Sequence, residues 1–191
     1  AKGHFPSGPF RGYKADAWEG GHRVPFIVRW PGKVKPGSRC AQTVVQADLM
    51  ATFAEILGTK LPDTAGEDSV SLLPLLKGDD RPVHEAVVHH SAGGRFAIRA
   101  GKWKLLLCPG SGGGFVPKDT DAAAHKGGLP PIQLYDMDSD PGEQTNLQAQ
   151  HPEVVQRLAK LLETLVTDGR STPGAPQKND VAVDIWKGKR P

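Results

Sequence analysis

The residues of this sequence most able to do chemistry lie in one short run around Lys14. Lys14 is followed by the pair Gly20 and Gly21 and then by an apolar run over residues 24–30. Glycines allow tight or left-handed turns, and the apolar run after them predicts a short strand that begins at the turn. A lysine in such a loop can bind an anion, although a lysine beside a strand is more often a solvated surface charge.

The other charged residues of this run are assigned to structure. Glu19 and Arg23 are expected to form an ion pair that fixes the turn, since an arginine close to a glutamate is usually a packing element. A lone histidine at position 22 is more typical of a hydrogen-bonded scaffold than of a proton shuttle. Lys14 therefore remains the candidate anion-binding residue.

The run as a whole resembles a late motif of the sulfatases of the alkaline phosphatase superfamily. In that motif Arg-Gly-x-Lys precedes Glu-Gly-Gly-x-Arg-x-Pro and, after a strand, Trp-Pro-Gly; these strings stand here at residues 11–14, 19–25 and 30–32. Softer matches, among them SLLPLLKG and DPGE, extend the resemblance from about residue 10 to about residue 169. The resemblance implies that Lys14 is a catalytic and substrate-binding residue that holds the sulfate of a sulfate ester.

The resemblance also implies hydrolysis of a sulfate monoester by a formylglycine nucleophile and a calcium ion. No cofactor is expected within this chain, because the nucleophile and the metal ligands of the family lie upstream of the matched motif. Residues 7–11 fit the S-x-P-x-R frame of formylglycine, but the residues after them do not continue the modification motif, so Ser7 is not assigned this role. The chain alone is expected to be inactive and to need the N-terminal part of the same enzyme as its partner.

Composition excludes some partners and leaves others open. The 191 residues carry a formal net charge of +3 without a Lys/Arg block, which argues against nucleic acid. No apolar stretch approaches the ~20 residues that cross a bilayer, so no membrane partner is expected. Cys40 and Cys108 show no zinc-ligand spacing, and whether they pair stays open.

Hydrophobic periodicity predicts a change from helix to sheet along the chain. A helix is expected over residues 47–57 and another between Pro152 and Gly169, with four strands between them. Short glycine-containing turns between the first three strands favour an antiparallel arrangement. The strands are predicted at residues 86–90, 96–100, 103–108 and 132–137.

The fold class implied by the resemblance is α/β for the intact enzyme and α+β for this chain. Residues 1–80 would be the C-terminal end of the large α/β catalytic domain. Residues 81–169 would be a small subdomain in which a helix covers an antiparallel four-stranded sheet, and residues 170–191 would be a surface tail. Truncation would expose apolar surface, so self-association of the chain alone is possible.

A second candidate residue lies at the end of the first predicted strand. His89 and His90 are adjacent, so their side chains project to opposite faces and do not form a chelating pair. The resemblance implies that the small subdomain leans over the active site, where His90 or Ser91 and the glycine-rich loop 109–114 would contact the non-sulfate part of the substrate. Asp79 and Asp80 are assigned to a turn rather than to a metal.

Two alternatives to a sulfatase stay open at this stage. A related phosphatase or phosphonate hydrolase would share the fold and a metal-assisted nucleophile, and a non-catalytic binding module would need neither. The expected ligand is a sulfated small molecule or glycan. An extracytoplasmic location, whether periplasmic, secreted or lysosomal, is implied by the resemblance only.

Overall fold

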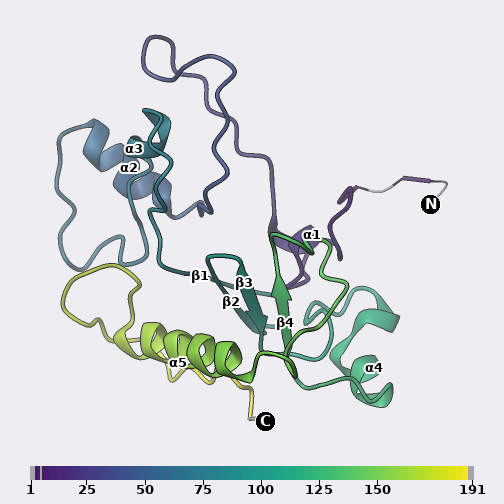
Figure 1. Cartoon of the computed structure of the whole chain (residues 1–191). Coiled ribbons are helices and arrows are strands. Elements are labelled where there is room, and N and C mark those ends of the chain that lie inside the picture. Colours follow the sequence, from purple (N-terminus) through teal and green to yellow (C-terminus); the bar gives the residue numbers. More distant parts are fainter. Residues whose placement is uncertain (1–2, 5, 189–191) are drawn as a thin grey trace. The chain divides into compact units, whose positions relative to one another are not determined.

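The structure of the protein is a computed structural model that describes residues 3, 4 and 6–188 (Figure 1). It divides into two compact units. The first unit combines the residues up to Val24, those from Val88 to Glu163, and those from Val183 onward. The second combines residues 25–87 and 164–182. The domain boundaries expected for the intact enzyme at residues 80 and 169 stay a prediction.

The first unit is built on a four-stranded sheet with the strand order β1-β2-β3-β4. Strand β3 pairs antiparallel with β2 on one side and with β4 on the other. The predicted antiparallel sheet is therefore confirmed, with strands up to two residues shorter than expected. The observed strands are β1 (Val87–His90), β2 (Phe96–Ala100), β3 (Trp103–Leu106) and β4 (Gln133–Asp136).

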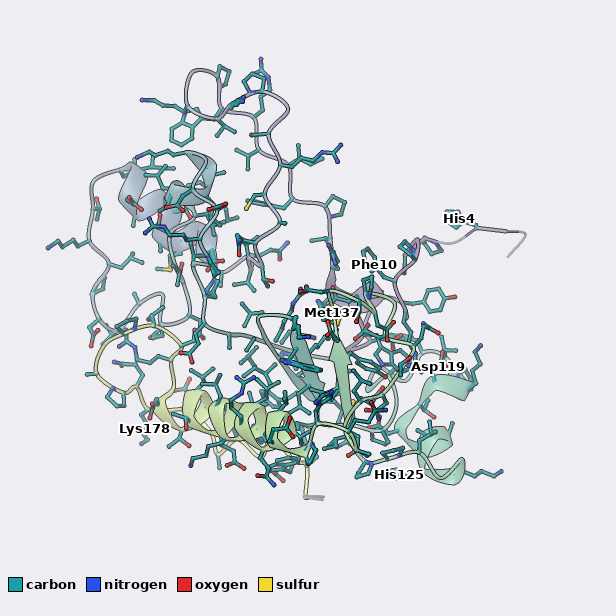
Figure 2. The ribbon with its side chains drawn as sticks, viewed as in Figure 1. His4, Phe10, Asp119, His125, Met137 and Lys178 are labelled. Atoms are coloured by element: carbon teal, nitrogen blue, oxygen red, sulfur yellow. The ribbon has the colours of Figure 1, made fainter. Side chains whose placement is uncertain are left out.

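Buried apolar residues lie on both faces of this sheet, and the segment after Lys14 packs on one of them. On one face, Ile98 stands opposite Leu105 and Leu105 opposite Leu134, all fully buried. On the other face, Leu106 forms a buried cluster with Ala17 and Trp18, and Met137, labelled in Figure 2, belongs to the same cluster. The segment just after Lys14 is thus part of the core of this unit, next to the sheet.

The long helix α5 (Pro152–Asp168) begins at a proline and ends before Gly169, as the sequence predicts. Gly169 has a φ of +62°, a left-handed conformation that favours glycine after the last turn of a helix. The helix buries Leu158 and Leu162 completely. No helix in the described part of the chain is long and apolar enough to span a membrane.

The remaining helices are short. The first unit also contains α1 (Glu19–His22), the 3-10 helix η1 (Pro117–Asp119) and α4 (Asp121–Lys126), and the second contains α2 (Asp48–Ile56) and α3 (Leu73–Leu76). In the second unit the buried carboxylate of Asp48 accepts hydrogen bonds from the backbone N–H groups of Val45 and Val70 and faces His84 Nε2 at 2.9 Å. The predicted helix over residues 47–57 is confirmed.

The strand predicted over residues 24–30 is wrong for this chain. These residues form no strand, and Val24 and Ile27 are 58% and 88% exposed. A strand requires a neighbouring strand to receive its backbone hydrogen bonds, and no described residue provides one. Its apolar side chains therefore remain on the surface.

The structure corrects the expectation for the tail and answers the open question of the cysteines. Most of residues 170–188 are exposed, but Arg170 and Ile185 are buried, so the segment is not wholly a surface tail; residues 189–191 lie outside the described part. Cys40 is exposed, Cys108 is buried, and both thiols are free. Burial raises the pKa of the Cys108 thiol, which makes it an unreactive core residue.

Candidate functional site

Lys14 occupies the exposed tip of a tight turn. The N–H of Asp16 donates to the carbonyl oxygen of Tyr13 at 3.0 Å, so Lys14 and Ala15 are the two central residues of a β-turn. Ala15 has a φ of +86°, and the Oδ2 atom of Asp16 accepts a hydrogen bond from the N–H of Tyr13 at 2.9 Å. A left-handed alanine is strained, so the surrounding structure must hold this turn in place.

The ends of the Lys14 segment are tied together. The N–H of Gly20 donates to the carbonyl oxygen of Arg11 at 2.7 Å, so residues 11–20 form a closed loop with Lys14 near its middle. Ser7 adds a hydrogen bond from its hydroxyl to the carbonyl oxygen of Gly12 at 2.9 Å. Ser7 is thus a bracing residue of this loop, in keeping with the sequence argument against a formylglycine there.

Two other segments hold the same loop from the side. The N–H of Ala92, in the turn after β1, donates to the carbonyl oxygen of Ala15 at 2.9 Å. The N–H of Ala17 donates to the carbonyl oxygen of Ser111 at 2.8 Å, and the glycine-rich loop that contains Ser111 packs on Asp16 at Gly113. The glycine-rich loop therefore supports the Lys14 loop.

The two histidines that end β1 point in different directions, as predicted. His89 points inward, with its Nε2 atom 3.1 Å from the carbonyl oxygen of Ala17. His90 is exposed, and its Nδ1 atom lies 2.8 Å from the carbonyl oxygen of Ser91. Ser91 is buried and donates from its hydroxyl to the carbonyl oxygen of Gly112, so His90 is the exposed side chain of the two. Through Ala92, the chain brings His90 close to the Lys14 loop.

A buried group of charged residues joins α1 to the sheet, and we call Lys104, Glu19, Glu143 and His22 the Lys104 cluster. Lys104 is fully buried in β3, and its Nζ atom lies 3.0 Å from Glu19 Oε1, 2.8 Å from Glu143 Oε1 and 3.1 Å from His22 Nε2. An ammonium group can donate but not accept, so Lys104 donates to Glu19 and His22, whereas its contact with Glu143 Oε1 is an ion pair and that buried oxygen has no hydrogen bond from the described residues.

The ammonium group also fixes the state of His22. Because Lys104 Nζ can only donate, His22 Nε2 accepts, and the imidazole is neutral with its proton on Nδ1. Burial, together with the charge of Lys104, lowers the pKa of His22 to about 4. Burial also lowers the pKa of His89, whose ring centroid is 3.8 Å from that of His22, to about 3. The predicted scaffold role of His22 is confirmed.

The two carboxyl groups of the cluster respond differently to burial. Burial raises the pKa of Glu19, but the charge and hydrogen bond of Lys104 outweigh it and hold that pKa at about 2. Glu19 also pairs with Arg23 at 3.2 Å, which confirms the predicted ion pair. For Glu143, burial prevails over Lys104 and raises the pKa above its ordinary value. Glu143 is therefore the carboxyl group at which burial is not fully offset by the nearby ammonium group.

These pKa values predict that acid destabilises the fold. Below about pH 6.5 the unfolded chain binds protons at His22 and His89, while the folded chain excludes them until about pH 4 and about pH 3. The free energy of unfolding should therefore fall between pH 6.5 and pH 4, by on the order of 1 kcal/mol per pH unit for each histidine. Glu19 adds a loss between about pH 4.5 and about pH 2.

Urea unfolding at several pH values measures this dependence. We expect His22→Gln to flatten the slope between pH 6.5 and pH 4.5, because the amide oxygen still accepts from Lys104 but does not titrate. His125→Gln is the matched control, since His125 is exposed, and it should leave the slope unchanged. An identical slope in the wild type and in His22→Gln would contradict a buried neutral His22.

Arg11, the first residue of the motif, is engaged on the structural side of the loop. Its Nη1 atom donates to the carbonyl oxygen of Glu143 at 2.9 Å, and its guanidinium group lies 3.7 Å from the centre of the Trp18 ring. Trp18 in turn donates from Nε1 to Gln133 Oε1 at 3.0 Å. The cationic residues of the motif thus divide into one exposed lysine and a set that anchors it.

Among the residues that the structure describes, no group of three or more His, Cys, Asp or Glu side chains is arranged to hold a metal ion. The acidic pair after α3 has the turn role that the sequence predicts: Asp79 Oδ2 accepts from Arg81 Nη2 at 2.5 Å. The calcium site expected for the family therefore does not fit the described residues of this chain.

Sequence reasoning missed the Lys104 cluster. Lys104 lies 85 residues from Glu19 along the chain, and the backbone N–H of Glu19 donates to Glu143 Oε2 across 124 residues, so local patterns carry no information on these contacts. One signal existed, because a lysine within the apolar run of residues 103–108 must be paired if the strand is buried on both faces.

Comparison with known proteins adds to this geometry. Residues 13–108 match the family described as "N-sulphoglucosamine sulphohydrolase, C-terminal". An N-acetylgalactosamine-6-O-sulfatase of Bacteroides thetaiotaomicron is 39% identical over 86% of this chain and 31% of its own length. The steryl-sulfatase of Mus musculus is 34% identical over 86% of this chain and 28% of its own length.

A solved structure resembles this chain over most of its length. It comes from work on glycosaminoglycan metabolism by Bacteroides thetaiotaomicron, with a TM-score of 0.72 and 37% identity over 86% of this chain and 33% of that chain. The chain therefore spans about a third of the length of these relatives.

Proposed function

The chain belongs to the N-sulphoglucosamine sulphohydrolase C-terminal family, and on that premise we propose that it is the C-terminal part of a sulfatase that hydrolyses sulfate monoesters. Lys14 binds the sulfate group, and His90 forms part of the pocket rim. The observation that carries the proposal is the exposed ammonium group of Lys14 at the tip of a loop that is held from several sides, inside the residues that match the family.

Lys14 would act by charge. Its ammonium group binds the sulfate oxygens and stabilises the negative charge that shifts onto them when the ester bond breaks. In water, opposite charges 4 Å apart gain only about 1 kcal/mol, whereas near a partly dry protein surface the gain is about 4 kcal/mol. Lys14 is exposed in this chain, so the proposal requires other parts of the enzyme to exclude water around it. The chain alone is therefore expected to be inactive.

We place the cofactors of the intact enzyme in its remaining part. A formylglycine would supply the nucleophile, and a calcium ion would offset negative charge on the sulfate. This chain's own contribution is to bind and orient the sulfate group through Lys14. Because the chain spans about a third of its relatives' length, the remaining part is also its expected partner. The exposed apolar side chains of Phe26 and Ile27 offer that part a surface to cover.

The substrate class we propose is a sulfated glycan. Support comes from the relative named for N-acetylgalactosamine 6-O-sulfate chemistry, which matches 86% of this chain. His90 is exposed and lies two residues before Ala92, whose N–H donates to the Lys14 loop, so we propose that its imidazole forms a hydrogen bond with a sugar hydroxyl. An extracytoplasmic location is part of the same proposal, since sulfated glycans are largely extracellular material.

The test is a comparison of esters on the full-length protein. We expect release of sulfate from N-acetylgalactosamine 6-sulfate, and a kcat/KM for an aryl sulfate well above that for the matching aryl phosphate. Faster turnover of the phosphate ester would support the phosphatase alternative instead. Binding of the sulfated sugar without turnover of any ester would support a non-catalytic module. This 191-residue chain, assayed alone, should release no sulfate.

A further inference from the structure

The Lys104 cluster lies at one end of the loop that carries Lys14. Glu19, at the start of α1, contacts Lys104 of β3 through its side chain and Glu143 through its backbone N–H, at 3.0 Å and 2.6 Å. The carbonyl oxygen of the same Glu143 accepts from Arg11 at 2.9 Å. Glu143, in the segment that follows β4, therefore contacts both ends of the loop: Arg11 before Lys14 and Glu19 after it. Figure 1 shows α1 next to β4.

Lys104 is what allows Glu143 to take this position. Glu143 is fully buried and has a φ of +53°, a strained conformation for a residue with a side chain. Within the described residues, Lys104 is the cation that pairs with its carboxylate, whereas Glu19 also has Arg23 at 3.2 Å and Arg99 at 4.0 Å. Loss of the Lys104 ammonium would leave two buried carboxyl groups side by side, and one of them would lack a counter-charge.

We propose that Lys104 is a positioning residue for Lys14: together with Glu19 and Glu143 it clamps both ends of the Lys14 loop to the sheet and fixes where the sulfate-binding ammonium group stands. This inference rests on the proposed function for its effect on activity. The geometric part of the inference is that Lys104, Glu19 and Glu143, which we call the clamp, order residues 11–20. This part does not depend on the reaction. A displacement of about 1 Å in a group that positions a substrate can cost about 100-fold in rate.

The variant Lys104→Met tests this, since methionine fills much of the same volume without the charge. In the full-length enzyme we expect kcat/KM for an aryl sulfate to fall about 100-fold. Lys102→Met is the matched control, because Lys102, in the turn before β3, pairs with Asp136 of β4 at 2.6 Å but has a side chain that is 47% exposed. That control should keep the activity within about twofold, as exposed ion pairs contribute little.

Coupling to Lys14 separates positioning from general destabilisation. If Lys104 acts through Lys14, Lys104→Met should lower the activity of a Lys14→Ala enzyme by less than threefold, far less than its effect in the wild type. Amide hydrogen exchange gives a second readout that does not need activity, with faster exchange expected at Ala17, Glu19 and Gly20 and unchanged exchange in β2. Equal effects of Lys104→Met with and without Lys14 would overturn the proposal.

Glu143→Gln keeps the proposal testable if Lys104→Met does not fold. In glutamine one carboxylate oxygen is replaced by an NH2 group, which donates and does not accept. The side chain can therefore face either Lys104 or the N–H of Glu19 with its remaining oxygen, but not both. We expect faster exchange at Glu19 and about tenfold lower kcat/KM, again only when Lys14 is present. Unchanged exchange across residues 11–20 would overturn the clamp. A wild-type enzyme without sulfatase activity would refute the proposed function, while the exchange data would still decide on the clamp.

Discussion

Replacing Lys14 by alanine in the full-length protein should lower kcat/KM for a sulfate monoester by about 1,000-fold, which is close to the largest effect of removing a single oxyanion-stabilising group. The ammonium group is at the exposed tip of a braced loop and has no structural task there, so its removal should leave the fold intact. We expect most of the loss in kcat and little in KM. The negative charge on the oxygens of the sulfate group that Lys14 stabilises is greatest in the transition state.

Steady-state kinetics with an aryl sulfate measures this loss. Lys126→Ala is the control, since Lys126 is an exposed lysine at the end of α4 in the same compact unit, and its activity should be unchanged. Lys14→Arg should recover only part of the activity, because a planar guanidinium does not replace a compact ammonium group. Full activity in Lys14→Ala would contradict the assignment of the sulfate-binding residue.

The second large effect is expected on stability, at the glycine pair of the motif. A Cβ atom on Gly21 would overlap the backbone carbonyl of Asp16, and one on Gly20 would overlap the carbonyl oxygen of Arg11, which accepts the hydrogen bond that closes the loop. Backbone atoms in a braced loop cannot move aside as a flexible side chain can. We therefore expect Gly21→Ala to lower the free energy of unfolding by about 3 kcal/mol.

Urea unfolding followed by tryptophan fluorescence suits this test, since Trp18 lies in the same loop and is buried. The matched control is Gly127→Ala, because Gly127 has a φ of −77° and a Cβ there would lie 3.4 Å from its nearest neighbour, Ala123 O. That substitution should stay within about 0.5 kcal/mol of the wild type. A Gly21→Ala protein as stable as Gly127→Ala would show that the loop is not closely packed.

Local pattern was sufficient for the elements whose neighbours are close in the sequence. The first three strands of the small sheet follow one another across short glycine-containing turns, and α5 has an apolar stripe between Pro152 and Gly169. The apolar run over residues 24–30 failed as a strand, although its composition favours one. A strand forms only beside a partner strand, and the described part of this chain contains no strand that pairs with residues 24–30.

The site divides in the same way. Lys14 could be predicted because a whole motif surrounds it, and the Glu19–Arg23 ion pair because the two residues are one helical turn apart. The contacts of Lys104 with Glu19 and Glu143 could not be predicted, because these three residues come from distant parts of the chain. Their charges balance only after the fold brings them together, so no window of sequence shows the arrangement.

The most direct measurement is a crystal structure of the full-length protein with a sulfated monosaccharide bound. We predict that Lys14 Nζ lies at charge-assisted hydrogen-bond distance, about 2.8 Å, from an oxygen of the sulfate group, with residues 11–20 held to the sheet through Glu143. A sulfate group bound entirely by other residues, with Lys14 directed into solvent, would contradict it.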